Sequence, residues 1–202
     1  MKARPWLRYG VPVFILAAVA AIVWLAPEEK TLGPGIKSVY VHVALTWTGM
    51  TGLTIAGLLG IGAAITNGGR LSRWAQMAGW VAIGFFGAGL AMSMIAAKVN
   101  WGGVFWAEPR AQAAMRIVAF ALIVQILCTW LRSVRLSGVL HVFATLFMLW
   151  TIFQAELVLH PRSPILTSES RSIQLTFASL FVLVAAGAGW TAWHFLGRRR
   201  KA

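Results

Sequence analysis

Two histidines occupy places where imidazole chemistry could occur at a membrane surface. His42 lies in the outer part of one long apolar run, and His160 immediately precedes Pro161 at the end of another. The two are expected on the same side of the membrane and at a similar depth. Imidazoles from two different helices at one depth could bind a haem iron from both faces. A single histidine at the end of a span is more often an interfacial anchor, so the hypothesis depends on the pair.

The outer Trp-containing loop, residues 99–110, is a second candidate feature. Trp101, Phe105 and Trp106 could form a flat apolar shelf for a large aromatic ring. Arg110 could then bind a carboxylate at the edge of that ring. Tryptophan is also common at membrane interfaces, so an interfacial aromatic belt is an alternative explanation of the same residues.

The remaining ionisable residues give weaker signals. Glu156 precedes His160 by four residues, and on a helix that spacing would let the carboxylate orient the imidazole. Arg116 lies inside an apolar run, where it could snorkel to the outer surface or pair with an anionic ligand. His141 and His194 are expected to be packing or interfacial residues. The single cysteine, Cys128, excludes an internal disulfide.

These residues must be positioned by membrane-spanning helices. Of the 202 residues, 59% are hydrophobic and 11% are charged, which is too little polar surface for a soluble domain of this size. A spanning helix needs about 20 apolar residues. We therefore predict an all-α integral membrane bundle of six transmembrane helices, forming a single domain over residues 1–202. The expected apolar segments are 10–26, 37–66, 72–98, 111–131, 136–158 and 172–196.

The distribution of charge predicts the orientation of this bundle. The net charge is +13, and all five acidic residues lie in alternate connections or at the adjoining end of a segment: Glu28, Glu29, Glu108, Glu156 and Glu169. The other connections and the two ends contain bases and no acid: Lys2, Arg4, Arg8, Arg70, Arg73, Arg132, Arg135, Arg198, Arg199, Arg200 and Lys201. The positive-inside rule then places both termini in the cytoplasm. Bases so placed are topology signals, and nucleic acid is not an expected partner. A cleaved signal peptide is the alternative interpretation of the first segment.

Small residues predict where helices approach one another closely. Within 37–66 they recur every four residues, at Gly52, Ala56, Gly60 and Ala64. Such a stripe is typical of tight helix packing in membranes. Gly84, Gly87 and Ala88 are expected to do the same in the next segment.

Together these segments resemble the CcmC/CcsA cytochrome c assembly family of haem-handling membrane proteins, and its smaller CcmC-like members in particular. The resemblance covers nearly the whole chain. The sequence around Tyr40 and His42 is similar to the family's Tyr-x-His-Val-Pro segment, and Trp101 through Arg110 aligns without gaps on its Trp-rich outer loop. His160 falls where the family has its second outer histidine. Differences include Ala44 in place of the proline, Val104, Phe105 and Ala107 in place of tryptophans, and Glu108 in place of aspartate.

The resemblance implies a function and a set of site residues. His42 and His160 would be the axial ligands of haem b, and Trp101, Phe105, Trp106, Glu108 and Arg110 would belong to the outer haem platform. The protein would present or transfer haem on the extracytoplasmic side for cytochrome c biogenesis, without conventional enzyme catalysis. Implied partners are haem, membrane lipid, an outer-side haem chaperone and other cytochrome c assembly membrane subunits. The implied location is a bacterial or archaeal plasma (inner) membrane, as a multi-pass protein.

Two other functions fit parts of the pattern. A b-type membrane cytochrome would also use two histidines, although such proteins usually stack haems across the membrane and only one pair is predicted here. A solute transporter or non-catalytic membrane subunit would explain the apolar spans. Transporters commonly have repeated halves or interrupted helices, and neither is evident in the sequence.

Overall fold

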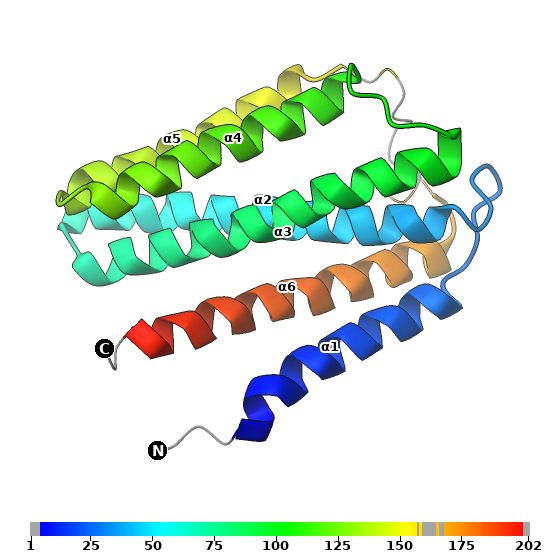
Figure 1. Ribbon diagram of the computed structural model, residues 1–202, viewed down its shortest axis with the longest axis horizontal. Coiled ribbons are helices and arrows are strands. Elements are labelled where there is room, and N and C mark those ends of the chain that lie inside the picture. The colour runs from blue at the N-terminus through cyan, green and yellow to red at the C-terminus, as the bar shows by residue number, and fades with distance from the viewer. Residues whose placement is uncertain (1–4, 157, 159–164, 166–167, 200–202) are drawn as a thin grey trace.

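Six helices form the architecture of this computed structural model, which describes residues 5–156, 158, 165 and 168–199, with side chains described from Tyr9 to Leu196 within those ranges. The expected all-α bundle of six helices is confirmed (Figure 1). The helices are α1 (Pro5–Leu25), α2 (Ile36–Thr66), α3 (Gly69–Trp101), α4 (Pro109–Trp130), α5 (Val134–Gln154) and α6 (Arg171–Arg199).

Five of these helices, α2 to α6, are long and apolar enough to cross a membrane, and the described side chains of α1 form a shorter apolar helix, Tyr9–Leu25. The chain is therefore a multi-pass membrane protein. Helix α2 has 31 residues and is about 46 Å long at 1.5 Å per residue. Because a hydrocarbon core is about 30 Å thick, α2 must tilt or extend beyond it.

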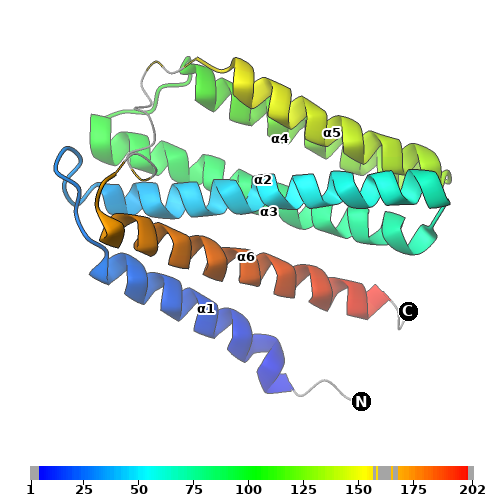
Figure 2. The same cartoon turned by 180° about the vertical axis from the view of Figure 1, so that it is seen from behind.

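Helix α2 occupies the centre of the bundle. It packs against α3, α5 and α6, while α4 covers α3 and α5 and α1 lies mainly on α6 (Figures 1 and 2). The short α2–α3 and α4–α5 turns lie at one end of the bundle, near Arg70, Arg73, Arg132 and Arg135. The α1–α2 and α3–α4 connections lie at the opposite end, which is the outer end under the predicted orientation. The candidate loop and the start of α2 are therefore at the same end.

The predicted stripe of small residues on α2 contacts two different helices. A side chain at Gly52 would meet Ala82 of α3, and one at Gly60 would meet the backbone carbonyl of Gly138 on α5. The prediction of close packing along this stripe is confirmed. Because α2 has no bulky side chain there, its backbone can approach both neighbours.

The corresponding prediction for α3 was wrong. A side chain at Gly84 or Gly87 would meet nothing within 4 Å, and Gly84 and Ala88 are exposed. The face of α3 that approaches α2 instead carries Gly89 and the buried Phe86. Several small residues on one helix leave more than one face free for contact, and only the packed bundle decides which face is used.

Candidate functional site

His42 points from α2 toward α3 and is held there by a hydrogen bond. Its Nδ1 atom lies 2.9 Å from the backbone carbonyl oxygen of Gly89. Because a carbonyl can only accept, Nδ1 carries the proton and donates it. In the neutral imidazole the lone pair then resides on Nε2. This is the arrangement found in metal-binding histidines, whose second nitrogen donates to a carbonyl or carboxylate, so His42 fits the role of a haem ligand through Nε2.

The close approach of α2 and α3 makes this hydrogen bond possible. A side chain at Gly89 would stand 2.5 Å from the Thr46 hydroxyl and 2.8 Å from the Thr46 backbone nitrogen. Any larger residue would therefore push the helices apart. The Thr46 hydroxyl also lies 3.4 Å from Nδ1 of His42, one turn along the same helix.

The outer loop is fixed relative to the start of α2. Helix α3 ends at Trp101 and is capped by Gly102, whose positive φ of 77° is suited to glycine and whose N–H donates to the Lys98 carbonyl. Two residues earlier, within α3, the Asn100 side chain donates to the Gly35 carbonyl and to the Ser38 hydroxyl, at 3.3 Å each. The loop therefore begins directly beside the first turn of α2. His42 lies about 9 Å further along that helix.

The aromatic residues of the candidate loop are exposed. Trp101 is 40% exposed, Phe105 42% and Trp106 57%. None of the three is buried in the core of the bundle, so their ring faces can contact a ligand or the membrane interface. The loop itself covers residues 102–108, which is shorter than the predicted 99–110, because α3 and α4 each extend further than expected.

Glu108 and Arg110 differ sharply in their surroundings. Glu108 is 6% exposed, and its carboxylate accepts a hydrogen bond of 2.7 Å from the Ala111 backbone nitrogen. It is the N-cap of α4, and a negative charge at that position also interacts favourably with the helix dipole. Arg110 is exposed in the first turn of the same helix. The structure thus gives Glu108 a capping role that we did not predict, and leaves the Arg110 guanidinium at the surface.

The second predicted ligand, His160, lies outside the described residues. Ile165, further along the same connection, is 1% exposed and belongs to a buried cluster that includes Ile36 and Tyr40 of α2. At Ile165, the connection between α5 and α6 is therefore attached to the outer end of the helix that carries His42.

The interpretation of Glu156 as a helical neighbour of His160 was wrong. Helix α5 ends at Gln154, and Ala155 has extended backbone angles of φ −75° and ψ 114°. Glu156 therefore lies beyond the helix, where a separation of four residues no longer implies a shared face. The end of α5 carries neither the glycine nor the proline that usually marks a helix terminus, so the sequence pattern placed the end too late.

Only part of a buried polar cluster between α4 and α5 was predicted from the sequence. His141, expected to be a packing or interfacial residue, is 1% exposed, and its Nδ1 donates to the Ser137 carbonyl at 2.7 Å. Its Nε2 lies 3.2 Å from Nε2 of Gln125, and the Cys128 sulfur lies 3.8 Å from its Nδ1. Polar side chains of this kind link transmembrane helices. The signal for it was Gln125, a lone amide within an otherwise apolar run.

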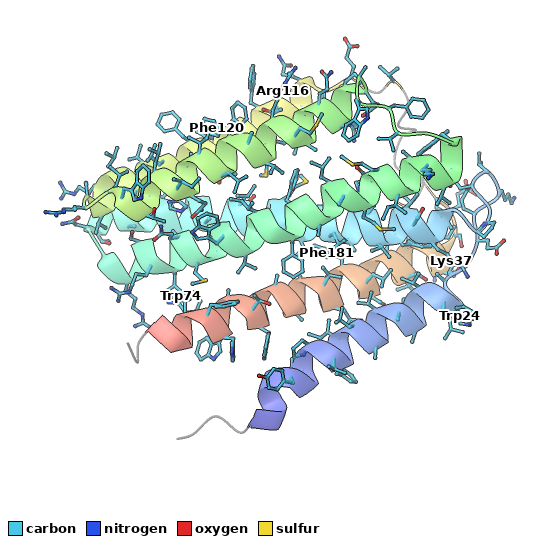
Figure 3. The ribbon with its side chains drawn as sticks, viewed as in Figure 1. Trp24, Lys37, Trp74, Arg116, Phe120 and Phe181 are labelled. Carbon is cyan, nitrogen blue, oxygen red and sulfur yellow. The ribbon has the colours of Figure 1, made fainter. Side chains whose placement is uncertain are left out.

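Arg116 is exposed on the outward face of α4, and its guanidinium donates to the Gln112 side chain at 3.5 Å (Figure 3). This position agrees with the snorkelling interpretation. Among the described residues, no group of three or more His, Cys, Asp and Glu side chains converges to hold a metal ion. A haem held by two axial histidines does not require such a group.

Comparison of the chain with protein-family models and with curated proteins finds no match in either. The fold and the residues described above define a class, a multi-pass helical membrane protein with a histidine and an exposed aromatic loop near the same end of the bundle. The family relationship remains the resemblance stated above.

Proposed function

We propose that this chain is a haem-binding membrane protein that presents or transfers haem b on the extracytoplasmic side for cytochrome c biogenesis. His42 and His160 would bind the iron, and the exposed residues of the outer loop would border the ring. When bound, haem supplies an iron with two axial positions for imidazole nitrogen. The chain's own contribution is to hold, orient and expose the haem, and no bond of the haem needs to be broken.

The hydrogen bond between His42 and Gly89 carries this proposal. An imidazole that serves only as an interfacial anchor needs no fixed tautomer, because water can satisfy either nitrogen. Here a backbone carbonyl on a neighbouring helix sets both the tautomer and the ring direction. That arrangement would make Nε2 the ligand atom. Gly89 is buried, so the acceptor is protected from competing water.

The outer loop supports the proposal through its exposed residues. Trp101, Phe105 and Trp106 offer aromatic surface at the end of the bundle where α2 begins. Stacking against a porphyrin would use the same ring faces that would otherwise contact lipid headgroups. The exposed Arg110 guanidinium would bind a propionate by paired hydrogen bonds.

The proposal extends to partners and location. An outer-side haem chaperone and other cytochrome c assembly membrane subunits would receive or supply the haem, in a bacterial or archaeal plasma membrane. A haem bound at the outer edge of the bundle, beside an exposed loop, would be accessible to such an acceptor. A b-type cytochrome that carries electrons would use the same ligands, and the experiment below separates the two.

The test is an absorption spectrum of the purified full-length protein after addition of haem b. We expect a low-spin bis-histidine spectrum, and we expect His42→Ala and His160→Ala each to reduce or abolish it. His194→Ala is the matched control, because His194 is at the opposite end of the bundle and stacks on Trp190. His141→Ala is a poorer control, because removal of this buried side chain would also disturb helix packing.

Retention of full haem and an unchanged spectrum in both outer variants would exclude the proposal. If the spectrum depends on His42 and His160, transfer of haem to a soluble acceptor distinguishes a delivery protein from an electron carrier. A delivery protein should release haem to apo-acceptor within the assay. A cytochrome should retain its haem and exchange electrons at a defined reduction potential.

A further inference from the structure

A groove lies between α1 and α2 on the outer half of the bundle, with a volume of about 450 Å³. Its α1 wall consists of side chains at helical spacing on one face, and its α2 wall adds two residues one turn apart: Leu16, Val19, Ala20, Val23 and Trp24 of α1, and Lys37 and Val41 of α2. This volume lies within the range of small-ligand sites, roughly 300–1,000 Å³. The walls are apolar, so the groove suits a hydrocarbon chain.

The charged side chain in this lining is Lys37, at the outer end of the groove. Its Nζ donates to the Trp24 backbone carbonyl at 2.9 Å, close to where α1 ends and near the junction with α2 (Figure 3). An ammonium has three donors, and this contact uses one of them. Among the described residues, no carboxylate forms an ion pair with Lys37. The groove is a shallow, open apolar surface with a partly buried cation at its outer end.

Helix α1 is loosely attached at this point. It packs mainly on α6 and touches α2 over a small area, and Leu16 and Trp24 are largely exposed. In a membrane, the space between α1 and α2 opens directly to lipid. A molecule that fills the groove would contact both α1 and α2 and so connect the two helices along the outer half of the bilayer.

We propose that this groove binds one acyl chain of an anionic phospholipid, whose phosphate pairs with the Lys37 ammonium. The apolar walls of the groove match the acyl chain, and the Lys37 ammonium at its outer end matches the phosphate. Phosphatidylglycerol carries a net negative charge, whereas the phosphate of phosphatidylcholine is balanced by its own choline. Lys37 should therefore favour the anionic lipid by about fivefold, the effect of one lysine beside an anionic headgroup. This site is independent of the proposed haem function.

Native mass spectrometry of the full-length protein in detergent tests the inference, with phosphatidylglycerol and phosphatidylcholine of matched acyl chains. Wild type should retain phosphatidylglycerol about fivefold more than phosphatidylcholine. Lys37→Gln preserves a donor for the Trp24 carbonyl and removes the charge, so it should abolish this preference. Lys30→Gln, in the exposed connection before α2, is the charge-matched control and should leave the preference unchanged.

A second pair of variants tests the groove itself. Ala20→Phe places a ring in the groove and should reduce retention of both lipids, whereas Ala17→Phe, on the exposed face of α1 outside the lining, should not. Circular dichroism verifies that each variant remains helical. Equal retention of the two lipids by wild type, a preference that survives Lys37→Gln, or an equal loss in Lys30→Gln would overturn the inference. Retention that Ala20→Phe leaves unchanged would place the lipid elsewhere and overturn it as well.

Discussion

The Nδ1 atom of His42 and the carbonyl oxygen of Gly89 are 2.9 Å apart, and this hydrogen bond joins α2 to α3. It connects His42, a predicted haem ligand, to the backbone of α3, on which no haem ligand is predicted. The ring direction of His42 therefore depends on how closely the two helices pack.

The first prediction concerns that dependence. Gly89→Ala would place a methyl group against Thr46, move the α3 carbonyl away from His42 and weaken haem binding by about 10- to 100-fold, the usual effect of losing such a positioning bond. Gly49→Ala is the matched control, because its methyl would meet the Phe86 backbone at the same interface without touching the His42 bond. Both variants should lose about 1–3 kcal/mol of stability through overpacking. Haem titration should separate them, and equal haem affinities would show that Gly89 acts through packing alone.

The second prediction separates the two possible roles of Glu108. Glu108 is the N-cap of α4, so Glu108→Ala should lower the free energy of unfolding by about 1 kcal/mol. Glu108→Asp should retain that stability, because aspartate is among the preferred N-cap residues. Thermal unfolding in detergent measures both changes. A haem defect in Glu108→Ala with an unchanged melting temperature would instead mark Glu108 as a contact of the haem.

The third prediction tests the crossing of α2 and α5. A methyl group in Gly138→Ala would meet the Gly60 carbonyl and the Ala64 backbone nitrogen, so the helices must separate at a cost of about 1–3 kcal/mol. Gly84→Ala, where a methyl meets nothing within 4 Å, should stabilise the protein by about 0.5–1 kcal/mol through its higher helix propensity. Melting temperatures of the two variants should therefore shift in opposite directions. Shifts of the same sign would contradict the observed packing faces.

The fourth prediction concerns pH and the connection before α2. The Glu29 carboxylate accepts hydrogen bonds from the backbone nitrogens of Leu32 at 2.9 Å and Thr31 at 2.8 Å. The bond from Leu32 is the main cause that lowers the pKa of Glu29 below its ordinary value of 4.5. Because the folded-state pKa is lowered, the stabilisation of this turn is fully present above the unfolded-state pKa. It is lost as the pH falls through the folded-state pKa.

An NMR titration of the Thr31 and Leu32 amide signals measures this transition. Its midpoint should lie below pH 4.5 in wild type, and Glu29→Gln should remove it. A midpoint at or above the ordinary value would mean that the turn does not hold the carboxylate in solution.

The sequence by itself determined the class of the fold. Long apolar runs, separated by short polar connections, can satisfy their backbone groups in a membrane only as helices or as a closed barrel, and runs of this length favour helices. The number of helices and the stripe on α2 followed from this pattern. His42 and the aromatic loop could also be selected, because residue types and spacing are visible without a structure.

Only the tertiary structure decided which surfaces meet. Gly89 looked no different from Gly84 or Gly87 in the sequence, yet Gly89 alone of the three packs against α2 and provides the acceptor for His42. Glu108 could be assigned to its cap only when the start of α4 was known. Contacts between helices depend on their rotation and depth, and these are set by the packing of all neighbours together. A one-dimensional pattern does not contain that information.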